Sequence, residues 1–86
     1  MFVIMSYDVG EKRVKKALTT SRKYLMHVHN SVFEGELTRA KLNALEKELS
    51  EILKENDGVI FWIFYTRNGM TREYIGKDPE KVDLII

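Results

Sequence analysis

Residues 59–65 (VIFWIFY) form an uninterrupted run of apolar, strand-forming side chains. Successive side chains of a strand point to opposite faces of its sheet. We therefore expect Phe61, Ile63 and Tyr65 on one face, and Ile60, Trp62 and Phe64 on the other. A strand that is apolar on both faces needs cover on both. Any fold that this chain adopts has to bury both faces of this strand.

The first half of the chain predicts a strand, a helix and a second strand. Residues 2–8 begin with four apolar side chains and predict a buried strand. Residues 11–25 repeat apolar side chains at helical spacing. Residues 26–33 (MHVHNSVF) alternate and include β-branched side chains, which favours a second strand. We expect Glu34-Gly35-Glu36 to interrupt that strand.

A second helix and further strands follow. Thr38 is suited to cap this helix, and Asn56-Asp57-Gly58 is suited to end it. Its apolar stripe consists of Leu42, Leu45, Leu49, Ile52 and Leu53. Asn68-Gly69 is a strong signal for a tight turn that leads into a shorter strand at residues 71–75. Residues 82–86 (VDLII) predict a final extended segment.

This β-α-β-α-β-β order with a C-terminal strand predicts one domain, residues 1–86, of the α+β class. Two helices on one face of an antiparallel sheet give a ferredoxin-like sandwich. The second face of the sheet would then be heavily apolar, and monomers rarely expose such a patch. We therefore expect a homodimer that packs sheet against sheet, with the C-terminal segment pairing with an edge strand of the partner.

Composition excludes several classes of site. The chain has no cysteine, which excludes disulfides, thiolate metal sites and cysteine nucleophiles. Two histidines are too few for a typical structural zinc site. No apolar run is long enough to span a membrane, and the N-terminus does not resemble a signal peptide. A cytoplasmic protein with no membrane partner is the expectation.

The formal net charge is +1, but the charges are unevenly distributed. Residues 11–24 hold six basic side chains against Glu11, and residues 34–57 hold four basic against seven acidic side chains. The basic group consists of Lys12, Arg13, Lys15, Lys16, Arg22 and Lys23. A polyanion would be attracted to the first segment. The alternative is that two amphipathic helices carry ordinary solvated faces.

Asp8 follows the first strand at the point where the chain turns into the basic helix. The end of a strand holds a side chain rigidly at the rim of a sheet, which suits a functional carboxylate. An aspartate in this position is also common as a plain helix cap or turn former. The sequence alone leaves both readings open.

The chain resembles the small CRISPR-associated protein of the spacer-acquisition complex, the CRISPR-associated endoribonuclease family. The resemblance is carried by the apolar first strand that ends in Tyr7-Asp8, by the basic helix with Arg13, and by residues 30–37 (NSVFEGEL) before an amphipathic helix. The order of elements extends the resemblance over nearly the whole chain.

This resemblance implies a ferredoxin-like homodimer that takes part in acquiring foreign DNA as new CRISPR spacers. It implies a bridge between dimers of the CRISPR integrase subunit that supports the bound DNA, and magnesium-dependent endonuclease activity on DNA or single-stranded RNA. The family's metal-site aspartate corresponds to Asp8, which would be catalytic and would hold Mg²⁺ at the dimer interface. Its basic-helix position corresponds to Arg13, and its strand serine and phenylalanine correspond to Ser31 and Phe33.

The nucleic-acid contacts expected from charge and resemblance together are Lys12, Arg13, Lys15, Lys16 and Ser31, with Tyr7 and Phe33 in support. One aspartate is a meagre magnesium site, so a dimer axis near two copies of Asp8 would be needed. A non-enzymatic DNA-binding scaffold and a stand-alone toxin-type ribonuclease of the same fold remain alternatives. Tyr7 and Phe33 could equally be core residues, and the sequence leaves open whether His27 or His29 takes part.

Overall fold

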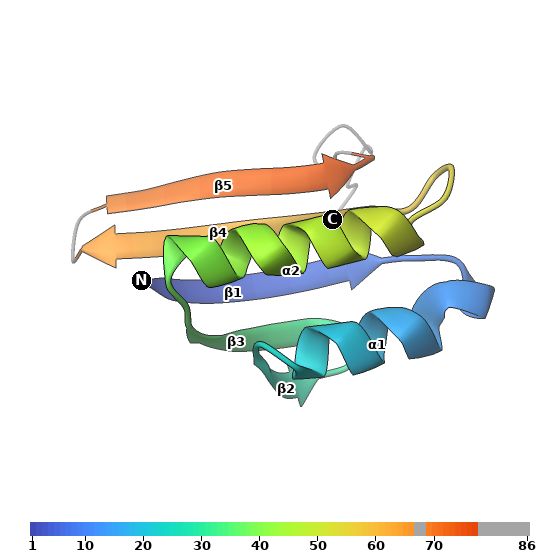
Figure 1. Cartoon of the computed structure of the whole chain (residues 1–86), viewed down its shortest axis with the longest axis horizontal. Helices are drawn as coiled ribbons and strands as arrows, with labels where there is room; N and C mark the ends of the chain where they lie inside the picture. Colours follow the sequence, from blue (N-terminus) through green and yellow to red (C-terminus); the bar gives the residue numbers. More distant parts are fainter. Residues whose placement is uncertain (67–68, 78–86) are drawn as a thin grey trace, which may run out of the picture.

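The computed structural model describes residues 1–66 and 69–77, and these form an α+β structure with two layers (Figure 1). The elements are β1 (Phe2–Asp8), η1 (Glu11–Arg13), α1 (Val14–Arg22), β2 (Met26–His29), β3 (Val32–Glu36), α2 (Arg39–Ile52), β4 (Gly58–Thr66) and β5 (Gly69–Gly76). The strands form an antiparallel sheet in the order β2-β3-β1-β4-β5. The predicted ferredoxin-like sandwich is confirmed, with β5 added beside β4.

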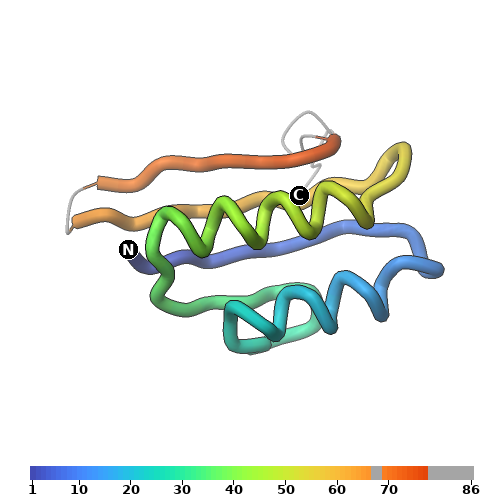
Figure 2. The backbone as a smooth tube through the Cα atoms, in the orientation of Figure 1, coloured from blue at the N-terminus to red at the C-terminus, as the bar shows by residue number. Residues whose placement is uncertain are grey.

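Both helices lie on the same face of the sheet, and the backbone trace shows them side by side (Figure 2). The core between the layers includes Val3, Met5, Leu42, Leu45 and Leu49, all completely buried. The Thr38 hydroxyl accepts a hydrogen bond from the Lys41 amide at 3.1 Å, which confirms the predicted cap of α2. No helix in the described part of the chain is long and apolar enough to cross a membrane.

Strand β4 alternates as its sequence predicts. Phe61 and Ile63 are completely buried under the helices. Trp62 lies on the opposite face, where it is the cross-strand neighbour of Ile4 on β1. We call this second face the open face; the side chains on it include Phe2, Ile4, Ile60, Trp62, Phe64, Met70 and Tyr74. Phe64, Met70 and Tyr74 are 37%, 50% and 47% exposed.

The prediction of a single strand over residues 26–33 is wrong, because this segment contains a tight turn. Asn30 has φ 40°, a left-handed conformation that asparagine tolerates better than most residues. The chain reverses there, and β2 pairs with β3 as a hairpin. The observed order is therefore β-α-β-β-α-β-β, which restores the second hairpin strand that a ferredoxin-like sheet requires.

Glu34-Gly35-Glu36 does not interrupt a strand, because all three residues pair with β1 inside β3. A side chain at position 35 would place its Cβ 3.3 Å from Cδ2 of Leu25, so glycine here makes room for a core leucine. The first helix is also shorter than the predicted residues 11–25. It starts as the 3₁₀ turn η1, and its α-helical part ends at Arg22.

Two predictions fall wholly or partly outside the described residues. Residues 82–86, the predicted C-terminal strand, lie outside them. Asn68 of the predicted turn does as well, while Gly69 opens β5 and pairs with Thr66. Strand β5 is longer than the predicted residues 71–75.

Candidate functional site

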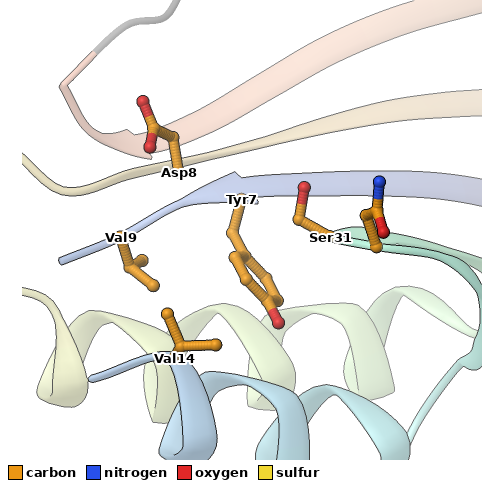
Figure 3. Close-up of a pocket in the computed structure, with 6 residues that line it drawn as sticks. Tyr7, Asp8, Val9, Val14 and Ser31 are labelled. Atoms are coloured by element: carbon orange, nitrogen blue, oxygen red, sulfur yellow. The ribbon is translucent and has the colours of Figure 1, made fainter. Parts of the chain in front are cut away.

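Asp8 is the last residue of β1, and its side chain lies on the open face. The strand alternates between buried and more exposed positions, and this alternation puts Tyr7 under the helices and Asp8 on the other side. Figure 3 shows the Asp8 carboxylate pointing in the opposite direction from the Tyr7 ring. Directly across from Asp8, β4 contributes Gly58, which has no side chain to cover the carboxylate. Asp8 is therefore presented to the outside at the rim of the sheet.

Tyr7 and Phe33 are core residues in this structure. Phe33 is completely buried, and the centroids of the two rings are 5.7 Å apart. Burial raises the pKa of the Tyr7 hydroxyl, and the nearby charge of Arg22 only partly opposes this shift. Tyr7 is therefore neutral at physiological pH. The contact between the two rings packs the end of β1 against β3.

Ser31 lies beside β1, because the Tyr7 amide donates a hydrogen bond to the Ser31 carbonyl at 3.2 Å. Figure 3 shows the Ser31 hydroxyl on the same side of the sheet as the Asp8 carboxylate. An open pocket of about 390 Å³ is lined by Tyr7, Asp8, Val9, Val14, Asn30 and Ser31. The structure thus brings Ser31 to the rim formed by Asp8 and the start of α1, although Ser31 is 23 residues after Asp8 in the sequence.

Arg13 has a partner that the sequence did not indicate. Its guanidinium forms an ion pair with Asp57, through an Nε contact and a second hydrogen bond from Nη2 at 3.0 Å. Gly10 makes room for this pair, because a Cβ at that position would lie 2.5 Å from Nη2 of Arg13. The Arg13 side chain thus joins the start of the basic segment to the segment before β4.

Asp57 is only 3% exposed and gathers four hydrogen bonds. Besides the two from Arg13, its carboxylate accepts the Gly10 amide at 2.8 Å and the Lys54 amide at 2.9 Å. Asp57 was predicted only as a turn former, because nothing local in the sequence reveals a partner 44 residues away. Its contacts fix the turn that directly follows Asp8, so Asp57 positions the end of β1.

We expect Asp57→Ala to lower the free energy of unfolding by about 3 kcal/mol, since it leaves a cation and two amides without their acceptor. The hydrogen bonds from Arg13, followed by those from the Lys54 and Gly10 amides, hold the pKa of Asp57 well below its usual value of 3.8. A carboxyl with a lowered folded-state pKa stabilises the protein above that usual value and loses its contribution as the pH falls below it.

Urea unfolding at neutral pH and in the acid range measures both effects. The wild type should lose stability below about pH 4, and Asp57→Ala should lose less over the same range. Asp8→Ala is the matched control, because it removes an exposed aspartate from the same corner of the molecule. Equal acid sensitivity of the wild type and Asp57→Ala would contradict this role of Asp57.

The lysines predicted to contact nucleic acid lie in η1 and in the first turn of α1. Lys12 is in η1, Lys15 and Lys16 are in the first turn of α1, and all three are exposed. No ion pair or hydrogen bond of their side chains occurs in the described residues. Unlike Arg13, these three cations have their charges available to a partner.

A magnesium ion needs several oxygen ligands, and one copy of this chain offers few. Within residues 1–66 and 69–77, no three His, Asp or Glu side chains come together as a metal site. Asp8 alone fits magnesium only as one carboxylate of a shared shell, since magnesium is commonly held by one or two carboxylates plus waters and substrate phosphates. A second copy of Asp8 would supply the second carboxylate.

A second charged cluster lies between α2 and β5. Arg39 forms ion pairs with Glu73 at 3.0 Å and with Glu46 at 3.9 Å. Burial and the neighbouring Glu73 raise the pKa of Glu46 to about 7. This cluster joins the start of α2 to β5 and is separate from the Asp8 rim.

Comparisons with known proteins all identify the same family. The model of the family "CRISPR associated protein Cas2" matches residues 1–72. "CRISPR-associated endoribonuclease Cas2" from Dictyoglomus turgidum is 44% identical over the whole length of both chains, and the protein of that name from Pyrococcus furiosus is 39% identical over the whole length of both.

Solved structures agree. A crystal structure of Cas2 superposes with a TM-score of 0.75 at 42% identity and covers 100% of this chain and 98% of that one. The structure of Streptococcus pyogenes Cas2 at pH 6.5 gives a TM-score of 0.68 at 30% identity, over 74% of this chain and 86% of that one. On its fold, its motifs and these full-length matches, the chain belongs to the Cas2 family of CRISPR-associated proteins.

Proposed function

We propose that this chain acts in the cytoplasm as a homodimeric component of CRISPR adaptation. In this role it bridges dimers of the integrase subunit and holds foreign DNA for insertion as a new spacer. The single observation that carries the proposal is that Asp8 shares the open face with a broad apolar surface. One event, the packing of two open faces, would cover that surface and bring two copies of Asp8 into one interface.

The apolar surface supports the dimer. The centroids of the Phe2 and Phe64 rings are 6.5 Å apart. Ile4 and Trp62 form the next pair of cross-strand neighbours on the same face. Met70 and Tyr74 lie on the same face of β5, on either side of Arg72, and are half exposed. Large contiguous apolar patches on a protein surface commonly mark interfaces. A second copy is a suitable occupant because the same patch is present on it and a two-fold interface is self-complementary.

The same packing would complete the carboxylate pair for magnesium-dependent endonuclease activity. Two copies of Asp8 would hold the ion, and the bound metal would lower the pKa of a water and offset charge that develops on the phosphate. In each copy, Tyr7 and Asp57 hold the strand end in place. The relatives named as endoribonucleases favour cleavage of RNA, and DNA is the alternative substrate. The bridging role does not depend on this hydrolysis.

The free cations Lys12, Lys15 and Lys16 are proposed to bind nucleic-acid phosphates, with Ser31 at the neighbouring rim. Arg13 is proposed to contribute by holding η1 in place through Asp57, because its guanidinium is already paired. Phosphate contacts position a nucleic acid without reading its sequence. Binding should therefore be strong on any duplex and sensitive to salt.

Changing Lys12, Lys15 and Lys16 to glutamate is expected to weaken binding of duplex DNA by about 10²-fold at about 0.1 M salt, because three phosphate contacts and their released counterions are lost. The slope of log affinity against log salt should become shallower by about 2.7. Fluorescence anisotropy over a salt series measures both quantities.

Lys41, Lys47 and Lys54 changed to glutamate form the matched control, since this variant makes the same change in net charge on and just after α2. The control should retain most of the affinity and of the salt slope. If the two variants weaken binding equally, the net charge of the protein attracts DNA and the α1 end of the molecule is not the contact surface. If neither weakens it, the basic segment is only a solvated surface.

A further inference from the structure

His27 occupies a defined position between the sheet and the end of α1. Its ring stacks on Phe33, with centroids 4.6 Å apart and an angle of 19° between the planes. Nε2 contacts the Asn30 carbonyl, and Nδ1 lies 3.4 Å from Nη2 of Arg22. Both ring nitrogens of this half-buried histidine therefore have a partner.

These two partners determine where the proton of the neutral ring lies. A carbonyl oxygen can only accept a hydrogen bond, so Nε2 carries the hydrogen that it donates to Asn30. A guanidinium can only donate, so Nδ1 accepts from Arg22 and carries no hydrogen. The remaining protonation site of His27 is thus the nitrogen that faces a permanent cation.

We propose that Arg22 and His27 form a phosphate-binding site that takes up one backbone phosphate of a nucleic acid together with one proton on Nδ1 of His27. Without an anion, a second proton would direct an N–H group at the Arg22 guanidinium, and two like charges would repel. A phosphate oxygen between the two groups would accept from both. Binding of the phosphate and uptake of the proton from solvent would therefore favour each other.

The groups around His27 fit this coupling. Arg22 faces it from α1, and the neutral Tyr7 hydroxyl lies within the electrostatic influence of Arg22 from β1. Phe33 from β3 supplies an uncharged ring. Lys23, the next residue of the chain after Arg22, forms an ion pair with Glu48 of α2. No carboxylate contacts His27 in the described part of the chain, so a phosphate would have no anion to displace.

The position of Arg22 also continues the proposed DNA surface. Residues seven apart on an α-helix are separated by two turns and lie on nearly the same face. Arg22 is seven residues after Lys15, so both project from one side of α1, about 10 Å apart along its axis. Lys15 and the Arg22–His27 pair could thus contact neighbouring phosphates of one strand. The inference therefore rests on the proposed binding of nucleic acid at α1.

The test is the affinity for a short duplex DNA at about pH 8 and about pH 6, the range in which histidine changes charge. For the wild type, affinity at about 0.1 M salt should rise about five- to tenfold on acidification, as expected for one added phosphate contact. His27→Gln should bind like the wild type at the higher pH and should lose this gain, since glutamine can keep both hydrogen bonds but cannot take up the proton. His27→Arg should reach the higher affinity at both pH values.

Two controls separate this site from other groups that titrate nearby. His29→Gln removes the other histidine, and Glu46→Gln removes a carboxyl whose pKa of about 7 falls in the same range. Both controls should keep the gain. The proposal is overturned if His27→Gln keeps the gain or if either control abolishes it. Failure of the lysine variants to weaken binding at the higher pH would instead refute the proposed DNA surface itself.

Discussion

Asp8→Asn is expected to slow metal-dependent cleavage of nucleic acid by at least about 10³-fold, which corresponds to about 4 kcal/mol of activation free energy. Asparagine has nearly the same shape as aspartate but lacks the charge that holds magnesium. The fold should be unaffected, because the exposed Asp8 side chain makes no hydrogen bond or ion pair with the described residues. Single-turnover cleavage of labelled RNA and DNA with and without magnesium measures the effect.

Glu11→Gln is the matched control, because it removes another exposed carboxylate a short distance along the chain. This control should cleave at the rate of the wild type. Cleavage by Asp8→Asn at the wild-type rate would show that the activity comes from another site or from a contaminating nuclease. Equal losses in both variants would show that general negative charge, and not the strand-end carboxylate, supports the reaction.

Glutamate at two adjacent positions of β4 is expected to have opposite consequences. Ile63→Glu should not fold, because an unpaired carboxylate at a completely buried position costs several kcal/mol out of a total stability of about 5–15 kcal/mol. Trp62→Glu should fold but remain monomeric, with the dissociation constant of the dimer raised by at least about 10³-fold. Circular dichroism reports the fold, and sedimentation equilibrium reports the association.

Val28→Glu controls for the addition of charge, since Val28 is 45% exposed and lies on the edge strand β2. This variant should fold and dimerise as the wild type does. A stable, folded wild-type monomer at micromolar concentration would exclude the proposed dimer. Unchanged association of Trp62→Glu would show that the two chains meet through a different surface.

Regular patterns in the sequence predicted the features that depend on local periodicity. Strict alternation placed Phe61 and Trp62 on opposite faces of β4, and the leucine stripe of α2 became its buried side. The hairpin within residues 26–33 was missed because alternation continues across it. The available signal was Asn30, a residue that tolerates the left-handed conformation found there.

The surroundings of the candidate site could be predicted only in part. The sequence identified Asp8 at a strand end, and the structure places it there on the open face. The ion pair of Arg13 with Asp57 and the contact of Arg22 with His27 depend on the tertiary fold. Both pairs change the interpretation of the basic segment. Arg13 is paired with the buried Asp57, and Arg22 lies next to His27.

Spacer acquisition in cells that carry Asp8→Asn in place of the wild-type chain tests the bridging role most directly. Trp62→Glu serves as the comparison that removes the dimer. Bridging depends on the shape and association of the protein and not on hydrolysis, so Asp8→Asn should still acquire spacers while Trp62→Glu should not. An Asp8→Asn protein that folds and dimerises normally but acquires no spacers would contradict the scaffold account and make the carboxylate pair central.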